Sequence, residues 1–541
     1  MLRLVSALAL VNALLMAPQW VSAGIADEPA AWIALEAALI VGLFSLLPRQ
    51  RWIVALAWVA AFGVVLATLV GLADLVFQVS LARSLNLFLD LYLVRVVGNL
   101  AVGNLGMPKT VFLMIALVLA LALALWGLAR LLASPAGKVA APPPAARRLA
   151  PKIAGILLVA LFALGLTHAT PATVQGRLAL PVVHLARAQA VALRDTWREK
   201  ERFQAELAQP DSYADVPGLL SRLQKMDVLL TFIESYGMAA LTDPEFAAVI
   251  RPRLDTLALR MQAAGIHLAT GTLASSTIGG QSWYAHGSTI SGRWISNQLR
   301  YDLLMASDRE TMVDDFHHAG HRTITLMPAI TMTWPEGVRL RYDEVFTRQN
   351  IPYAGPPFYW VTMPDQYTWS YLADVRARAG GRPLFVETAM VSSHAPWTPI
   401  LPMVPWDEIG DGSRFAPFEQ QGHPPEELWV DIDKLRHDYA LSLDYSLQAM
   451  TGFAERYLDA RTLLIVLGDH QAAPWVTNDT VSTVPVHVFT RDPALLEPFL
   501  AWGFRGGALP DAAREPARMD QFRGWFVRAF SDPSAAQEAR P

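Results

Sequence analysis

The stretch RTLLIVLGDHQAAPW, residues 461–475, contains side chains that could bind a metal ion. Residues 462–467 form a short, continuous apolar run, which is typical of a buried strand in a parallel sheet covered on both faces. The run ends at Gly468, Asp469 and His470. Ligands of open α/β sheets collect beyond the carboxyl ends of the strands, and a carboxylate beside an imidazole suits a divalent metal ion. A plain polar turn is the alternative, because Asp and Gly are common turn residues.

Two other apolar runs also end in groups that bind metals or phosphates. Residues 228–233 lead into Glu234, and residues 384–391 lead into a Ser-Ser-His segment that ends at His394. Parallel strands joined by right-handed crossovers place these ends at one edge of a sheet. We therefore expect Glu234, His394 and the Asp-His pair to share one site.

The expected nucleophile of this site is Ser282. It follows Gly279, Gly280 and Gln281, and it opens a helix predicted over residues 282–291. The free N–H groups and the positive dipole end of a helix N-terminus favour an anionic group and a lower hydroxyl pKa. Coordination to a metal would activate the hydroxyl further. The alternative is a serine that only caps the helix.

Several other side chains are candidates for binding a substrate. His286 lies one helical turn after Ser282 and is expected to face a phosphate. Trp283 and Trp360 belong to a group of aromatic residues that either line a substrate pocket or fill the core. Asp365 lies in a loop that could reach the site, whereas His487 reads as an ordinary strand residue.

The elements that must position these side chains alternate between strand and helix. The sequence predicts strands over 228–233, 323–327, 384–391, 462–467 and 484–490, and helices over 246–264, 282–291, 312–319 and 437–455. Residues 270–280 read as a Gly/Ser/Thr-rich loop. This alternation predicts an α/β domain over 217–541 with a mainly parallel central sheet and helices on both faces.

The beginning of the chain has the composition of a membrane region. Of the 541 residues, 53% are hydrophobic, and the mean hydropathy is +0.28, which is high for a soluble protein. The excess lies in residues 1–170, where we predict an α-helical transmembrane bundle of about five helices, followed by an amphipathic connector over 171–216. The predicted spans are 4–23, 30–47, 52–76, 111–132 and 153–166, with an interfacial or re-entrant helix over 81–105.

The basic residues predict the orientation of these spans. Arg3 precedes the first span, Arg49 and Arg51 lie between the second and third, and four bases lie between residues 138 and 152. The N-terminus is therefore expected in the cytoplasm, and the α/β domain on the extracytoplasmic side of the cytoplasmic membrane. Cleavage after Ala23 would leave four spans with the same final orientation.

The remaining composition excludes some classes of function. The net charge is -4 and the isoelectric point is about 6.3, so the chain has no electrostatic footprint for a nucleic acid. It has no cysteine, which rules out disulfides, cysteine zinc sites and thiol nucleophiles.

Four motifs together resemble the alkaline phosphatase superfamily, in its membrane-anchored, sulfatase-like branch of lipoteichoic acid synthases, phosphoglycerol transferases and phosphoethanolamine transferases. The motifs are DVLLTFIESYG, GGQSWYAHGSTISG, VSSHAPW and LLIVLGDHQ. The resemblance implies that Glu234, Asp469 and His470 bind a metal, with Ser282 as nucleophile and fourth ligand. It also implies that His394 binds the substrate or transfers a proton.

The motifs depart from the family in two places. Sulfatases proper carry Cys or Ser followed by Pro and Arg at the nucleophile, whereas this chain has Ser-Trp-Tyr-Ala-His and no cysteine, which argues against sulfate esters. The second histidine that phosphoethanolamine transferases carry shortly after the Asp-His pair is absent, since residues 471–484 contain none. We therefore expect one metal ion, zinc or manganese, with magnesium less well suited to this donor set.

The activity implied by the resemblance is transfer of a phospholipid head group, of the phosphoglycerol or phosphoethanolamine type. The donor would be a membrane lipid, the intermediate a phosphoserine at Ser282, and the acceptor a surface glycan or another lipid. One alternative is a phosphodiesterase or sulfatase that uses the same site with water as acceptor. Another is an inactive, membrane-anchored scaffold that keeps the fold.

Overall fold

The computed structural model describes residues 2–26, 31–48, 50–133, 145–166, 176–209, 213 and 215–532. Two compact units make up the chain: the first comprises Met1–Gln78 and Arg83–Arg198, and the second comprises Val79–Ala82 and Glu199–Pro541. Within the predicted connector, residues 171–175, 210–212 and 214 lie outside the described residues, and so do residues 138–144 of the basic loop between residues 138 and 152.

The first unit is helical. Its helices are α1 (Leu2–Ala26), α2 (Leu35–Leu46), α3 (Arg51–Leu81), α4 (Leu87–Asp90), α5 (Leu93–Leu132), α6 (Ala145–Leu166) and the first part of α8 (Pro181–Leu207). Among the described residues, four segments are long and apolar enough to cross a membrane: Leu2–Gly24, Arg51–Leu81, Gly106–Leu132 and Leu149–Leu166. Close packing is visible between α2 and α6, where a Cβ on Gly155 would lie 2.9 Å from the carbonyl oxygen of Gly42, as is common where small residues let membrane helices approach.

Two predicted membrane segments take a different form. The expected second span is the 12-residue helix α2, about 18 Å long at 1.5 Å per residue, which is short for a hydrocarbon core of about 30 Å. The residues just before α2 form β1 (Ile33–Ala34), which pairs with β2 (Leu178–Ala179). Residues 81–105 are not one interfacial helix, because they comprise a loop, α4 and the start of α5, which kinks at Gly106 with a φ of 77°.

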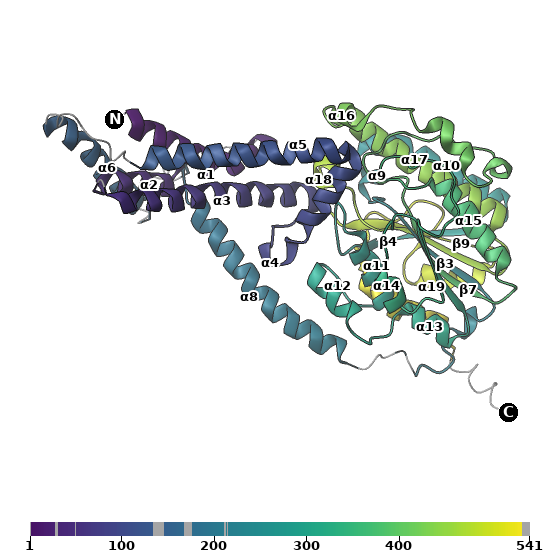
Figure 1. The fold of residues 1–541 in the computed structure, drawn as a ribbon. Coiled ribbons are helices and arrows are strands. Elements are labelled where there is room, and N and C mark those ends of the chain that lie inside the picture. Colours follow the sequence, from purple (N-terminus) through teal and green to yellow (C-terminus); the bar gives the residue numbers. More distant parts are fainter. Residues whose placement is uncertain are drawn as a thin grey trace. The chain divides into compact units, whose positions relative to one another are not determined.

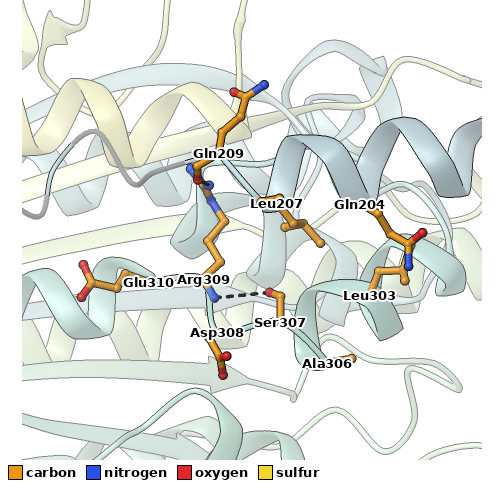
Figure 2. A pocket seen from close by; sticks show the side chains of 10 residues that line it. Gln204, Leu207, Gln209, Leu303, Ala306, Ser307, Asp308, Arg309 and Glu310 are labelled. Carbon is orange, nitrogen blue, oxygen red and sulfur yellow. Dashed lines mark hydrogen bonds between the residues drawn. The ribbon is translucent and has the colours of Figure 1, made fainter.

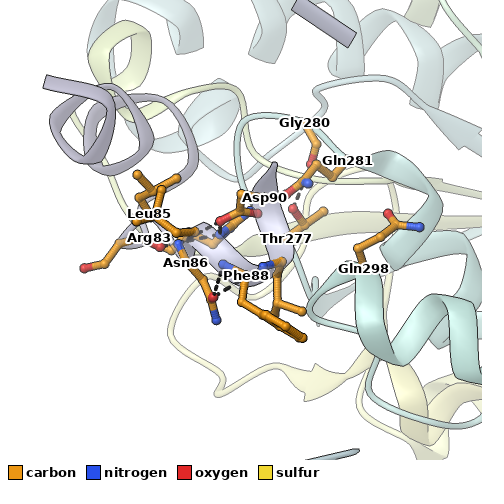
Figure 3. Close-up of polar contacts among 12 residues, drawn as sticks. Arg83, Leu85, Asn86, Phe88, Asp90, Thr277, Gly280, Gln281 and Gln298 are labelled. Atoms are coloured by element: carbon orange, nitrogen blue, oxygen red, sulfur yellow. Dashed lines mark hydrogen bonds and ion pairs between the residues drawn. The ribbon is translucent and has the colours of Figure 1, made fainter. Parts of the chain in front are cut away.

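Two charged residues between α3 and α5, Arg83 and Asp90, form an ion pair with each other. Asp90 is buried, and its carboxylate accepts hydrogen bonds from Arg83 at 2.8 and 2.9 Å and from the backbone N–H of Asn86 at 2.8 Å (Figure 3). The Asn86 side chain caps α4 by accepting from the backbone N–H of Phe88, and it donates to Thr196 of α8 at 2.9 Å. The loop after α3 is therefore held to α8 within the first unit.

The second unit contains a nine-stranded sheet in the order β10-β4-β9-β8-β3-β7-β5-β6, with β11 pairing with β4. The strands are β3 (Asp227–Ile233), β4 (His267–Ala274), β5 (Arg322–Met327), β6 (Glu344–Thr347), β7 (Leu384–Met390), β8 (Thr462–Gly468), β9 (Thr483–Thr490), β10 (Arg505–Gly506) and β11 (Ala517–Arg518). The run from β8 to β6 is parallel, whereas β9 runs antiparallel to both β8 and β4. The predicted mainly parallel sheet is confirmed.

One predicted loop was wrong, and strands β4, β6, β10 and β11 of this sheet were not predicted. The first half of the expected loop over 270–280 belongs to β4, whose small and polar residues pair with β9 along its whole length. Strand β6 is short and only partly buried, so it lacks the apolar run that reveals a strand in a sequence.

Helices cover both faces of this sheet (Figure 1). On one face lie α10 (Pro244–Ala263), α15 (Asp365–Arg378) and α17 (Ile432–Tyr457), and on the other lie α11 (Ser282–Ser291), α13 (Met312–His318) and α20 (Phe522–Phe530). Alternate residues of a strand point to opposite faces of the sheet. In β3, Leu229 and Ile233 pack against the first layer of helices, and Leu230 and Phe232 pack against the second. The shorter helices are α9 (Ala239–Thr242), α12 (Gln298–Met305), α14 (Pro335–Arg339), α16 (Pro425–Leu428), α18 (Pro474–Thr477) and α19 (Glu497–Ala501).

The last turns of α8 belong to the second unit and pack beside the helix that carries Ser282. Phe203 is completely buried in a cluster with Tyr284 of α11 and with Tyr301 and Leu304 of α12. Glu199 supports this packing by accepting a hydrogen bond from Arg300 at 2.6 Å.

Candidate active site

The central strand β3 and its neighbours end at the same level of the sheet. Ile233, the last residue of β3, lies opposite Gly468 of β8 on one side and Met390 of β7 on the other. The backbone N–H of Asp469 donates to the carbonyl of Ile233 at 3.2 Å, which continues the pairing one residue further. Glu234 therefore emerges between the ends of β7 and β8.

This edge brings together two carboxylates and an imidazole. Glu234, Asp469 and His470 each offer one ligand atom, and these atoms all lie within 4.8 Å of one another. The Nε2 atom of His470 is 3.2 Å from Oε1 of Glu234 and 3.7 Å from Oδ2 of Asp469. The convergence that the sequence predicted for these side chains is thus present in the structure.

The two oxygens of Asp469 have different partners. Oδ1 accepts hydrogen bonds from the backbone N–H groups of Ser235 at 2.9 Å and His470 at 2.6 Å. Ser235 has a φ of 58°, a left-handed conformation that turns its N–H back toward the carboxylate. Oδ2 is left to face the imidazole, so Asp469 both holds the turn and contributes to the cluster.

A backbone carbonyl orients His470. Its Nδ1–H donates to the carbonyl of Gln471 at 2.9 Å, so Nε2 is the ring nitrogen that faces the cluster, an orientation that is usual for metal-binding histidines. The same carbonyl accepts the N–H of Gly279 at 2.8 Å, from the loop before Ser282. The sequence does not reveal this role of Gln471, because a residue of any type offers a backbone carbonyl.

The loop before α11 places Ser282 in the same cluster. Thr277 Oγ1 donates to the carbonyl of Gly280 at 2.7 Å within the loop (Figure 3), and Gln281 has a φ of 62° just before the helix begins. The Ser282 hydroxyl donates to Oε2 of Glu234 at 3.1 Å, and its Oγ lies 3.2 Å from Nε2 of His470. Ser282 is the first residue of α11, whose N-cap is Gln281, so its hydroxyl contacts the cluster and does not cap the helix.

The charges of this cluster strongly perturb one another. Burial and the negative charge of Glu234 raise the pKa of Asp469 to about 7. Although burial lowers the pKa of His470, the carboxylates Asp469 and Glu234 raise it to about 9. Burial also raises the pKa of Glu234, but the positive charges of His470 and His394 outweigh it and bring that pKa well below its usual range. Positive charge in this cluster therefore stabilises the carboxylates.

The residues fit a single divalent cation. Two carboxylate oxygens, an imidazole Nε2 and a hydroxyl form a four-donor set of mixed oxygen and nitrogen, which suits zinc or manganese. The fixed orientation of His470 supplies the outer hydrogen bond that such sites use. Glu234, Asp469 and His470 would hold the ion, with Ser282 beside it.

His394 reaches the neighbourhood of the cluster through the end of β7. Ser393 Oγ donates to the carbonyl of Glu234 at 2.6 Å, which ties the two strand ends together. The ring of Trp360 packs edge-on against His394, with centroids 5.4 Å apart. Asp365 does not lie in a loop but begins α15; its Oδ1 accepts the backbone N–H groups of Val391 and Ser392 and so fixes the segment that carries His394.

The other candidate substrate residues lie in different surroundings. Trp283 donates from its Nε1 to Gln298 and packs at the edge of the Phe203 cluster, away from the ligand atoms. His286 donates from Nδ1 to Oε1 of Glu387 at 2.7 Å. His487 is a buried strand residue held by Tyr236 and Thr270.

A cavity of about 640 Å³ lies elsewhere in the second unit, between the end of α8 and the loop after α12 (Figure 2). Its lining includes Gln204, Leu207, Leu303 and Arg309, and none of the residues of the cluster.

Comparison with known proteins gives similarity at the level of solved structures. No protein-family model and no curated protein matches the chain. The integral membrane lipooligosaccharide phosphoethanolamine transferase A (EptA) from Neisseria meningitidis is similar over 92% of this chain and 87% of its own, at 13% identity and a TM-score of 0.47. The Streptococcus pyogenes phosphoglycerol transferase GacH, solved with sn-glycerol-1-phosphate, is similar over 63% and 82% of the two chains, at 12% identity and a TM-score of 0.37.

A third similar structure carries a family description. It is a protein from Vibrio parahaemolyticus, similar over 62% of this chain and 75% of its own, at 14% identity and a TM-score of 0.37. That protein is described as a member of the alkaline phosphatase superfamily, the family that the four sequence motifs of this chain resemble.

Proposed function

We propose that this protein is a membrane-anchored, metal-dependent transferase of the alkaline phosphatase type, which moves a phospholipid head group through a phosphoserine at Ser282. The observation that carries the proposal is the position of one hydroxyl. Ser282 Oγ lies 3.1 Å from Glu234 and 3.2 Å from His470, at the N-terminus of a helix that favours an anionic group.

The residues around Ser282 support its role as nucleophile. Glu234 accepts the hydrogen bond of the hydroxyl, so the lone pairs of Ser282 Oγ point away from the carboxylate. A divalent cation bound by Glu234, Asp469 and His470 would lower the pKa of the Ser282 hydroxyl and offset the charge of a phosphate. The first N–H groups of α11 are available to the phosphate oxygens.

The transfer has two balanced steps. In the first, Ser282 Oγ gives up its proton to solvent and forms a bond to phosphorus while the bond from phosphorus to the diacylglycerol oxygen breaks, and the leaving oxygen takes a proton. In the second, a hydroxyl of a surface glycan or of another lipid loses its proton and attacks the phosphorus, and the Ser282 oxygen leaves and takes a proton from solvent. His394 is the expected proton donor of the first step and acceptor of the second, because it lies at the adjacent strand end.

The apolar helices give the reaction its setting. Four of them have the length and composition to cross a membrane, and the basic residues of the sequence favour a catalytic domain on the extracytoplasmic side. Tethering the site beside the bilayer raises the effective concentration of a lipid donor.

Product analysis tests the proposal directly. The full chain, purified in detergent micelles with zinc or manganese, is given phosphatidylethanolamine or phosphatidylglycerol labelled separately in the head group and in one acyl chain. We expect labelled diacylglycerol, and a mass increase on the peptide that contains Ser282. Ser282→Ala should abolish both while leaving metal content unchanged, and Ser282→Thr, which keeps a hydroxyl, is the matched control.

The fate of the head group separates transfer from hydrolysis. A head group attached to an added glycan or lipid supports transfer, whereas a free head group assigns the site to a phosphodiesterase. Full turnover by Ser282→Ala would remove Ser282 as the nucleophile, and a protein without bound metal or turnover would fit a scaffold.

A further inference from the structure

A buried carboxylate in the middle of β7 has no part in the chemistry above. The Glu387 side chain is 1% exposed. Its Oε1 accepts Nδ1–H of His286 at 2.7 Å, and its Oε2 accepts the Tyr342 hydroxyl. No lysine or arginine forms an ion pair with Glu387 in the part of the chain that the structure describes. Burying a carboxylate at such a position costs free energy unless hydrogen-bond donors surround it. The presence of a carboxylate here, with its two donors, therefore needs an explanation.

His286 connects Glu387 to the nucleophile helix. It lies four residues after Ser282 on α11, so both side chains project from the same face of that helix. Its imidazole stacks on the ring of Phe232 in β3, with centroids 3.8 Å apart and planes inclined by 27°. Phe232 is two residues before Glu234, and Glu387 is on the strand that leads to His394. One side chain of α11 thus contacts the two strands that carry the other site residues.

Apart from the polar contacts of Ser282 with Glu234 and His470, α11 also packs on the sheet through apolar side chains. Ala285 and Ile290 pack into the core layer on this face. Apolar contacts set how closely a helix approaches a sheet, but they tolerate small rotations and shifts of the helix. The hydrogen bond from His286 to Glu387 has a required direction and length, so it fixes the rotation of α11 about its axis and its position along β7.

We propose that Glu387 is a positioning residue for the nucleophile: through His286 it fixes α11, and therefore Ser282, against the strands that carry Glu234 and His394. The inference rests on the proposed function, in which Ser282 must face a phosphate in line with its leaving group. A shift of about 1 Å in a reacting group can lower a rate by about 100-fold, so such a constraint has a measurable effect.

Three substitutions separate positioning from general stability. Glu387→Leu removes the acceptor of His286, and we expect kcat on fluorescent phosphatidylethanolamine micelles to fall about 100-fold with KM nearly unchanged. Glu387→Gln keeps an acceptor for Nδ1–H and should retain kcat within about tenfold. Tyr342→Phe is the matched control, because it removes the hydroxyl that donates to Glu387 but keeps the hydrogen bond from His286. This variant should retain kcat within about threefold.

A double-mutant cycle tests whether Glu387 acts through His286. If it does, His286→Ala combined with Glu387→Leu should lose no more activity than either single change. Additive losses would overturn the proposal, as would an equal loss in Tyr342→Phe and Glu387→Leu, or a Glu387→Leu protein with the kcat of the wild type.

Amide hydrogen exchange gives a readout that does not depend on turnover. We expect faster exchange in the peptide over 282–291 of Glu387→Leu, and unchanged exchange in the same peptide of Glu387→Gln and Tyr342→Phe. Unchanged exchange in Glu387→Leu would contradict the proposal. The wild-type protein could turn over neither phosphatidylethanolamine nor phosphatidylglycerol while the three variants show the expected exchange pattern. That result would contradict the proposed function and support the constraint on α11.

Discussion

At the scale of single residues, the candidate site depends on side chains whose two polar atoms have separate tasks. Asp469 uses Oδ1 to hold two backbone N–H groups and presents Oδ2 to the cluster. His470 donates from Nδ1 to a carbonyl and presents Nε2. Each candidate ligand atom is therefore oriented by the protein itself, which lowers the cost of ordering a site for an ion.

Asp469→Asn tests this arrangement. The amide can still accept the two backbone N–H bonds, but it removes the negative charge, so we expect metal affinity to fall by at least about 100-fold, since even partners outside the ligand set change affinity 10- to 100-fold. Elemental analysis and chelator competition measure the change. Asp479→Asn, in the loop after α18, is the control, and full occupancy in Asp469→Asn would exclude Asp469 from the ligands.

At the scale of elements, the end of β8 must pass very close to the turn after β3. Gly468 permits this, because a Cβ built there would lie 1.8 Å from the backbone carbonyl oxygen of Tyr236. The two turns carry Asp469 and Glu234, so this close approach sets the separation of their carboxylates.

Gly468→Ala should therefore affect both stability and metal binding. Overpacking of this kind costs about 1–3 kcal/mol, and we expect a lower thermal midpoint together with a weaker metal affinity as the two turns separate. Gly506→Ala in β10 is the matched control, since a Cβ there meets nothing within 4 Å. A Gly468→Ala protein with the thermal midpoint and affinity of the wild type would contradict the close approach.

At the scale of the whole molecule, a buried neutral histidine links stability to pH. His487 is completely buried in β9 between Tyr236 and Thr270, and burial lowers its pKa to about 3. An unfolded histidine has a pKa of about 6.5, so below that pH the unfolded chain binds a proton that the folded chain does not. This contribution to stability is complete above pH 6.5 and is lost as the pH falls toward 3.

We expect the free energy of unfolding to fall by about 1.4 kcal/mol per pH unit from this group, or about 2 kcal/mol between pH 6.5 and 5. His487→Gln should show a shallower fall over that window than the wild type, measured by denaturant titration at each pH. The exposed His423→Gln should keep the wild-type slope; equal slopes in all three proteins would exclude His487 as the source.

The absence of cysteine makes the orientation of the chain measurable. A single cysteine introduced at Thr256→Cys, on the exposed side of α10, should react with a membrane-impermeant maleimide in intact cells. Ser134→Cys, between the fourth and fifth predicted spans where the sequence places the chain in the cytoplasm, should react only after the cells are lysed. The reverse pattern would contradict an extracytoplasmic site.

The sequence by itself determined the types and order of the site residues. Glu234, His394 and the Asp-His pair follow apolar runs, and in a parallel sheet such runs end at one edge, so their convergence could be predicted from local pattern and topology. The start of the helix at Ser282 was also predictable, since the glycines before it mark the end of a loop, although its N-cap is Gln281 and not the serine.

Only the tertiary structure decided which partners these groups have. The contact of His286 with Glu387 joins residues 101 positions apart, the carbonyl of Gln471 serves both His470 and Gly279, and the polar strand β4 forms because β9 offers it a full ladder of partners. Likewise, α2 is short because residues before it pair with β2 near residue 178. Such contacts depend on distances between segments remote in the chain, whereas periodicity and residue type report only on a side chain's immediate neighbours.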